Sequence, residues 1–241
     1  MLNALWELWP SPHAALVGGV CGVVLFCGAG LLAAMWREQG WRVGDTRKLF
    51  HLTIFTGAAL LRWKFGSGAV AAYGVVVAMG VLFATWQGRR SRIFNALARP
   101  SDAPHEKLHV LSPLICTAVG GVLAHLIAGP LAGIAYLIAG WGDAVGEPVG
   151  IRWGRHRYRV PAFEQLTAER SWEGSAAVCV ASTFAAALGL LLAGRSGVDL
   201  VAWSLILGCA AVVIEAASPH GWDNLTLLVG IAWLTRWCEG G

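Results

Sequence analysis

The chain has 241 residues, of which 56% are hydrophobic and only 13% are charged. Soluble domains carry about 25% charged residues, so this composition excludes an ordinary soluble protein. The mean hydropathy of +0.60 indicates an integral membrane protein. The formal net charge of +4 does not indicate a nucleic-acid-binding protein, because the basic residues are spread over several loops.

The apolar runs are continuous rather than alternating, which predicts membrane helices and not the strands of a barrel. A membrane-spanning helix needs about 20 apolar residues. We therefore expect an all-α fold, a polytopic transmembrane helical bundle of about eight spans, in a single integral-membrane domain over residues 1–241. The expected spans lie at about 13–36, 48–65, 67–87, 109–128, 130–150, 173–193, 198–217 and 222–238.

The distribution of Lys and Arg predicts how the chain is oriented in the membrane. Fourteen of the 18 basic residues lie in the first, third and fifth loops between the expected spans, and four lie elsewhere. Cytoplasmic loops carry an excess of Lys and Arg. We therefore expect a multi-pass protein whose three basic loops are cytoplasmic, in the inner membrane if the source is bacterial.

The fifth expected span ends in a segment with two carboxylates, Asp143 and Glu147. A carboxylate at membrane depth costs roughly 2.5–3.5 kcal/mol and is usually functional. Residues four apart share a helix face, so these two side chains suit a hard divalent cation such as Mg²⁺. The glycines at 142, 146 and 150 also form a small-residue stripe that is typical of close helix packing. We expect Pro148 to end or kink this helix.

Three further polar segments are predicted on the same side of the membrane. The first is Arg47-Lys48-Leu49-Phe50-His51 at the start of the second span. Its two cations and its histidine could bind a polyanion such as a triphosphate. The structural alternative is that basic side chains at a membrane interface simply extend toward water.

The second segment joins the last two expected spans. Glu215 ends one span and Asp223 begins the next, followed by Asn224, across a turn that contains Ser218 and His220. Helix capping by Ser218 or Asp223 is the structural alternative, but capping does not require two acids at one membrane face.

The third segment precedes the sixth span and follows a basic run at 152–159 that includes Arg155. Ser171 resembles a helix-start residue, whereas Arg170 and Glu173 are interpreted as functional. We expect the basic run to attract phosphates from the cytoplasm. The chain has no GxxxxGK[ST] phosphate loop.

In this order, the segments resemble the CTP-dependent lipid-alcohol kinases, the group of dolichol kinase, phytol/farnesol kinase and fungal-type CTP-dependent diacylglycerol kinase. This group is related to phosphatidate cytidylyltransferases. The resemblance covers about residues 45–238 and rests on four elements: Arg47-Lys48 with His51; Asp143 with Gly150, continued by Gly154; Arg170 to Ser175, where Arg170 replaces the usual Lys; and Glu215 with Asp223-Asn224-Leu225-Thr226.

The resemblance implies Mg²⁺-dependent transfer of the γ-phosphoryl group of CTP to a membrane-embedded primary alcohol, most often an isoprenoid alcohol. The implied catalytic residues are Asp143, Asp223, Lys48 and His51. The implied nucleotide- or phosphate-binding residues are Arg47, Lys48, Gly150, Gly154, Arg155, Arg170, Glu173 and Asn224. The implied metal ligands are Asp143, Glu147 and Glu215.

Two other functions remain open at this point. A cytidylyltransferase would make a CDP-lipid and pyrophosphate, but the stretch 219–224 lacks the His-Gly-Gly…Asp-Arg pattern expected of that branch. A transporter would carry acids across the depth of the membrane, whereas here they gather at one face. The sequence leaves open polyprenol, phytol, farnesol or diacylglycerol as acceptor, CTP or ATP as donor, and the oligomeric state.

Overall fold

The structure, a computed structural model, describes residues 2–160, 168–219 and 221–238. His220 and the residues between the two strands therefore lie outside the described residues. The chain divides into two compact units, Met1–Ile115 and Cys116–Gly241, and each is described by itself.

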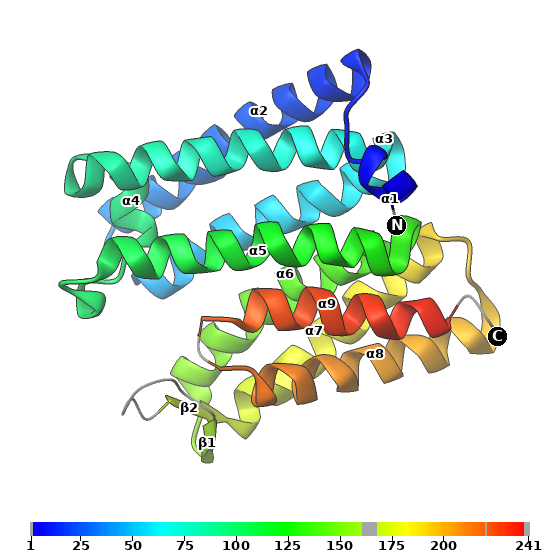
Figure 1. The fold of residues 1–241 in the computed structure, drawn as a ribbon. Helices are drawn as coiled ribbons and strands as arrows, with labels where there is room; N and C mark the ends of the chain where they lie inside the picture. The colour runs from blue at the N-terminus through cyan, green and yellow to red at the C-terminus, as the bar shows by residue number, and fades with distance from the viewer. Residues whose placement is uncertain (1, 161–167, 220, 239–241) are drawn as a thin grey trace. The chain divides into compact units, whose positions relative to one another are not determined.

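The first unit is built on two long helices (Figure 1). Its elements are α1 (Leu2–Trp6), α2 (Pro12–Glu38), α3 (Val43–Gln87), η1 (Gly88–Arg90), α4 (Arg92–Leu97), η2 (Pro100–Asp102) and the start of α5 (Glu106–Ala128). Helix α2 packs along α3, and the short α4 packs against both. Thr46 is fully buried and donates a hydrogen bond to the Ala96 carbonyl at 2.7 Å, which fastens α4 to the start of α3.

Helix α3 contains a break at the place where the sequence predicts a new span. Gly66 has φ 80° and ψ −174°, a conformation that residues with a side chain rarely adopt. The two halves of α3 therefore match the expected spans 48–65 and 67–87.

The second unit contains the remaining helices and a two-stranded sheet. Its elements are the end of α5, η3 (Gly129–Leu131), α6 (Ala132–Trp153), β1 (Arg157–Val160), β2 (Ala168–Ser171), α7 (Trp172–Leu192), α8 (Gly197–Ala217) and α9 (Asp223–Trp237). Helices α6, α7 and α8 pack in sequence, and α9 contacts α6 and α8. Every residue from 131 to 140 is buried, as expected for a helix that is apolar all round.

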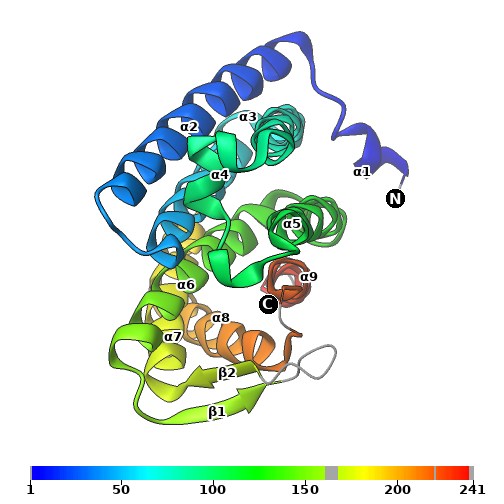
Figure 2. The same cartoon turned by 90° about the vertical axis from the view of Figure 1, so that its left-hand side faces the viewer.

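The antiparallel hairpin of β1 and β2 is the one departure from an all-α fold among the described residues, and the sequence analysis missed it. Arg157 pairs with Ser171 and Val160 pairs with Ala168. Figure 2 shows both strands beside the ends of α7 and α8.

Five helical segments of the described chain are long and apolar enough to cross a membrane: Pro12–Glu38, Val43–Arg90, Glu106–Trp153, Trp172–Leu192 and Gly197–Ala217. Two of them are 48 residues long, and each is interrupted, at Gly66 and at η3. The helical membrane bundle is thus confirmed. Helix α9 has only 15 residues and is not among the five, so the count of eight spans stays a prediction.

Candidate active site

The predicted acid pair lies on α6, and both carboxylate side chains are half-buried. Asp143 and Glu147 are four residues apart on an unbroken helix, so they share one face. The prediction that the two acids share a helix face is therefore confirmed, whereas their role as metal ligands stays a prediction.

The glycines next to these acids bring α6 close to α7. A Cβ atom on Gly142 would lie 2.6 Å from the Ser182 hydroxyl oxygen, and one on Gly146 would lie 2.3 Å from a Val178 methyl. A Cβ atom on Gly150 would lie 3.1 Å from the Ser171 hydroxyl oxygen and 3.6 Å from the Gly174 Cα atom. Helix packing therefore accounts for the glycine stripe, including Gly150, which the resemblance implied as a phosphate-binding residue.

Pro148 does not end α6, contrary to that part of the expectation. The helix continues to Trp153 and is capped by Gly154. A proline removes one backbone hydrogen bond, but the packed residues Gly146 and Gly150 on either side hold the helix against α7. This is a case in which tertiary packing overrides local preference.

In the first unit, the predicted polyanion segment forms the second turn of α3. The Lys48 side chain is buried, at 6% relative exposure, while Arg47 and His51 are half-buried. The His51 ring stacks on Phe55 with centroids 4.1 Å apart. A buried ammonium group is stable only where it is paired or hydrogen-bonded, so Lys48 is more than an interfacial side chain extended toward water.

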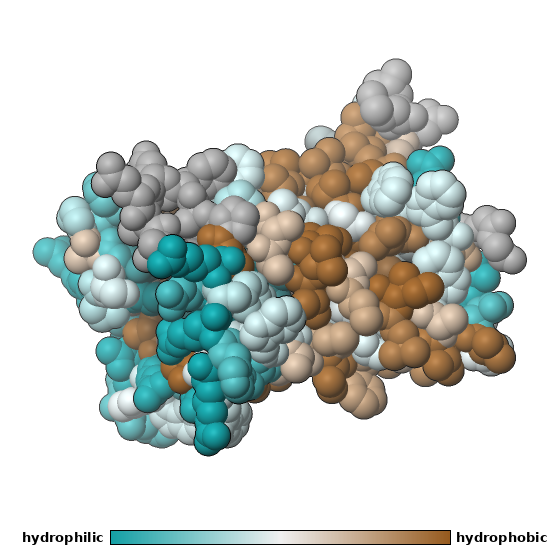
Figure 3. Space-filling model, turned by 90° about the horizontal axis from the view of Figure 1, so that it is seen from below, coloured by the Kyte–Doolittle hydropathy of each residue, from teal (hydrophilic) through white to brown (hydrophobic). Residues whose placement is uncertain are grey.

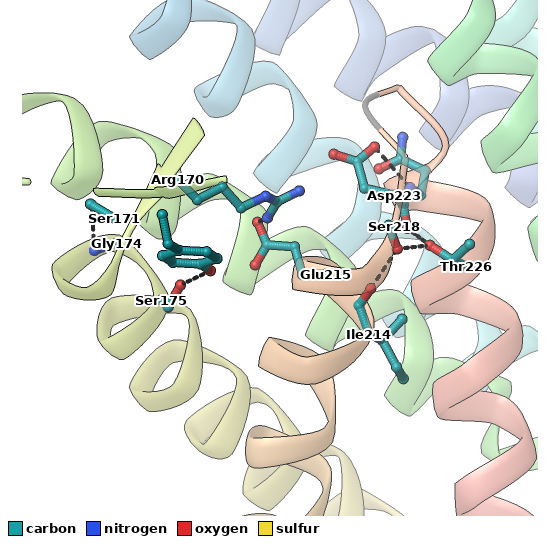
Figure 4. A network of polar contacts seen from close by, with 11 residues as sticks. Arg170, Ser171, Gly174, Ser175, Ile214, Glu215, Ser218, Asp223 and Thr226 are labelled. Carbon is teal, nitrogen blue, oxygen red and sulfur yellow. Dashed lines mark hydrogen bonds and ion pairs between the residues drawn. The ribbon is translucent and has the colours of Figure 1, made fainter. Parts of the chain in front are cut away.

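The segment 170–175 is a set of anchors that tie the hairpin to the helices (Figure 4). Arg170 of β2 forms an ion pair with Glu215 near the end of α8, and both side chains are mostly buried. The Ser171 hydroxyl caps α7 by accepting a bond from the Gly174 amide at 3.1 Å, as the sequence predicts for a helix start. Ser175 lies 2.7 Å from the Tyr158 hydroxyl of β1.

Glu173 is also engaged by the hairpin. Its carboxylate accepts bonds from the His156 backbone amide at 3.3 Å and lies 2.7 Å from the His156 ring nitrogen Nδ1. Trp172, one residue earlier, packs against the Tyr158 ring at 5.2 Å. The structure thus gives Arg170 and Glu173 partners within the chain, where the resemblance implied contacts with nucleotide. Arg155, the other implied contact here, is exposed.

The turn between α8 and α9 is fixed by two hydroxyl groups. The buried Ser218 hydroxyl donates to the Ile214 carbonyl at 2.6 Å and contacts the Thr226 hydroxyl. Thr226 in turn reaches the Trp222 and Asp223 carbonyls at 3.2 and 3.1 Å. Ser218 therefore ends α8 instead of capping the start of α9, so that alternative for Ser218 is wrong.

Asp223 is the first residue of α9 and is half-buried. Its Oδ1 atom accepts a bond from the Asn224 backbone amide at 3.0 Å. The Asn224 side chain is buried and donates to the Thr117 hydroxyl of α5 at 2.9 Å. Asn224 thus fastens the start of α9 to α5, which accounts for it without a nucleotide.

The predicted set of three metal-ligand carboxylates is not assembled. Across residues 2–160, 168–219 and 221–238, no group of three or more His, Cys, Asp or Glu side chains is placed to hold a metal ion. Glu215 is paired with Arg170 instead, which neutralises its charge. The acid pair on α6 remains the candidate ligand set.

The sequence indicates no role for three residues of this region, namely His156, Tyr158 and Thr117, and it indicates Ser175 only as the end of the segment that begins at Arg170. The strand at 157–160 has an alternating pattern that could have revealed Tyr158 as an inward-facing residue. Thr117 has no such pattern, because its partner is more than one hundred positions away along the chain.

The chain is similar to a phytol kinase from Synechocystis sp. (strain ATCC 27184 / PCC 6803 / Kazusa). The two are 31% identical over 193 residues, which cover 78% of this chain and 78% of the relative. The chain belongs to the phytol kinase family of lipid-alcohol kinases. No family model matches it.

Membership in this family confirms the resemblance seen in the sequence and makes the chain a membrane-associated kinase of lipid alcohols. The match spans most of the chain, so it includes most of the polar segments described above. The family, rather than the fold, favours an enzyme over a transporter.

Proposed function

We propose that this protein transfers the γ-phosphoryl group of CTP to an isoprenoid alcohol of the phytol, farnesol or polyprenol type. The similarity to a phytol kinase supports the acceptor class. The observation that carries the proposal is the half-buried acid pair on α6. Helix packing explains the neighbouring glycines, but it does not explain the two acids. Acids in such a position are costly and need a function.

The acid pair fits Mg²⁺, which prefers oxygen ligands. Mg²⁺ is usually held by one or two carboxylates together with waters and the phosphates of a substrate, rather than by a cage made of protein alone. Asp143 and Glu147 would hold the ion, and two carboxylates are enough for such a site, so it needs no third ligand from the described residues. When bound, the ion would neutralise the negative charge of the triphosphate.

The protein's own residues would position the reactants. Arg47 and the buried Lys48 would neutralise phosphate oxygens, and His51 stands on the same face as Arg47. The alcohol oxygen would form a bond to the γ-phosphorus as the bond from that phosphorus to the bridging oxygen breaks, so that CDP leaves. Asp223 would accept the alcohol proton.

The location of the reaction follows from the membrane assignment. We infer that the chain crosses the membrane several times, with the loops near Arg47, Arg90 and Arg155 in the cytoplasm, where CTP is available. The fourteen-to-four distribution of basic residues supports this orientation. The lipid tail would stay in the bilayer and present its hydroxyl at the interface.

The decisive experiment measures which phosphate of CTP, the γ-phosphate or the α-phosphate, is transferred to the lipid. Purified full-length protein in lipid nanodiscs would receive CTP labelled in the γ- or in the α-phosphate, with phytol, farnesol, a polyprenol or diacylglycerol as acceptor. We expect the γ-label and not the α-label in the lipid product, loss of transfer with EDTA, and recovery with Mg²⁺.

Each other outcome identifies a different function. Transfer of the α-label with release of pyrophosphate would establish a cytidylyltransferase. Equal transfer from γ-labelled ATP, supplied in place of CTP in a parallel reaction, would contradict the proposed preference for CTP. Absence of any labelled lipid with every acceptor, from protein that melts cooperatively, would contradict the kinase proposal.

A further inference from the structure

Strand β1 of the hairpin carries exposed arginines on the face opposite Tyr158. Residues alternate between the two faces of a strand. On β1, Tyr158 contacts Ser175 of α7, whereas Arg157 and Arg159 on the other face are exposed. The Arg157 side chain is 61% exposed. One hairpin face is therefore anchored to the protein and the other is basic and accessible.

The chain connections hold these arginines close to the end of two apolar helices. Only three residues separate the end of α6 at Trp153 from β1, and α7 begins directly after β2. Three residues reach at most about 10 Å. Trp153 and Trp172, at the two helix ends, are 63% and 65% exposed, and exposed tryptophans at span ends are typical of the membrane interface.

The charge of this surface is strongly positive. Arg152 and Arg155, which precede β1 in the chain, are exposed as well. Within the described hairpin, the opposing acid on the face of Arg157 and Arg159 is Glu169, 3.8 Å from Arg157. The nearby acids Glu173 and Glu215 are engaged by His156 and Arg170. Figure 3 shows hydrophilic residues collected at the end where the hairpin lies, next to an apolar surface.

We propose that this basic hairpin face, formed by Arg157 and Arg159 with Arg155, binds the phosphate groups of anionic phospholipids. Basic residues next to a membrane span are attracted to anionic lipids, and arginine pairs well with phosphate. Arg157 and Arg159 lie on the strand face opposite Tyr158 and are exposed, so their side chains are accessible to surrounding headgroups. The proposal rests on α6 and α7 crossing the membrane, as the proposed function assumes.

Lipid binding can be measured without turnover. Full-length protein in neutral detergent would be titrated with phosphatidylglycerol or phosphatidylcholine, and bound lipids counted by native mass spectrometry. We expect a preference for phosphatidylglycerol that high salt removes. The double variant Arg157→Gln/Arg159→Gln should weaken phosphatidylglycerol binding by roughly tenfold or more, while Arg157→Lys/Arg159→Lys should retain most of it.

A matched control variant removes two positive charges from positions outside the hairpin. Lys64 and Arg236 are both exposed, so Lys64→Gln/Arg236→Gln should leave the lipid preference unchanged. A glutamine variant that melts like the wild type and keeps its preference would overturn the proposal. So would a higher KM for CTP in that variant with unchanged lipid binding, since Arg157 and Arg159 would then serve the nucleotide. Intact lipid binding in a protein without kinase activity would refute the proposed function alone.

Discussion

Two helix contacts in this chain use glycine in the same way but differ in what stands beside the glycines. In the first unit, Gly18 and Gly22 of α2 face α3, and a Cβ atom on Gly18 would lie 2.2 Å from the Ala69 carbonyl oxygen. In the second unit, Gly142 and Gly146 of α6 face α7 with similarly short clearances. Both contacts rely on residues without side chains, as is common in membrane helices.

The residues that follow these glycines differ. In α2 they are Gly19 and Val23, and Val23 is 53% exposed. In α6 they are Asp143 and Glu147, both half-buried. A close helix contact therefore explains the glycines in both places but requires acids in neither. The α2–α3 contact serves as an internal reference for packing, and the acids of α6 are an addition that packing does not explain.

The largest effect is expected when one of the two acids of α6 loses its charge. Asp143→Asn keeps the shape of the side chain and removes its charge, so it should lower turnover by about a thousandfold or more, the upper range for a single electrostatic group. The thermal melting temperature in detergent should stay close to that of the wild type. Near wild-type turnover at low Mg²⁺ concentration would show that α6 resembles α2 in being a packing element only.

The second prediction concerns Asp223 at the start of α9 and its part in phosphoryl transfer. Asp223→Ala should reduce turnover by at least about a hundredfold, with little effect on folding because Ser218 and Thr226 hold the turn. Asp223→Asn should be similarly inactive if charge matters. An active asparagine variant together with an unstable alanine variant would instead identify Asp223 as a structural residue of the helix start.

A smaller effect is expected at the Arg170–Glu215 pair. If the pair only anchors the hairpin, Arg170→Gln and Glu215→Gln should lower activity to a similar extent, roughly tenfold, by loosening the same contact. The double variant Arg170→Gln/Glu215→Gln should then be no worse than either single variant. An increase in the KM for CTP in Arg170→Gln alone would assign Arg170 to the nucleotide.

The smallest effect on turnover is expected at the α2–α3 contact, where stability changes instead. Gly18→Ala should destabilise the protein by about 1–3 kcal/mol, because its Cβ would overlap a backbone carbonyl. Gly19→Ala is the matched control: nothing lies within 4 Å of its Cβ, so it should be neutral or slightly stabilising. Melting curves of the two variants would check this, and equal effects would show that the contact is not tightly packed.

The sequence alone determined where the long helices lie and that they belong in a membrane. Each apolar run has a length set by the thickness of the bilayer, which is a local property that any single segment carries. The spacing of Asp143 and Glu147 and the N-cap at Ser171 are equally local, since a helix fixes which residues share a face and which residue begins it. For the same reason the four polar elements indicate the family from the sequence alone.

Only the tertiary structure decided which partners the polar residues take. Arg170 and Glu215 are 45 positions apart and Asn224 and Thr117 are 107 apart, so no periodicity or motif connects them. The continuation of α6 beyond Pro148 depends likewise on glycine contacts with α7, which outweigh the local cost of a proline. The hairpin is held in place because Tyr158, Arg170 and Glu173 find partners on α7, α8 and the chain before β1. An isolated two-stranded hairpin is only marginally stable, so these distant partners matter.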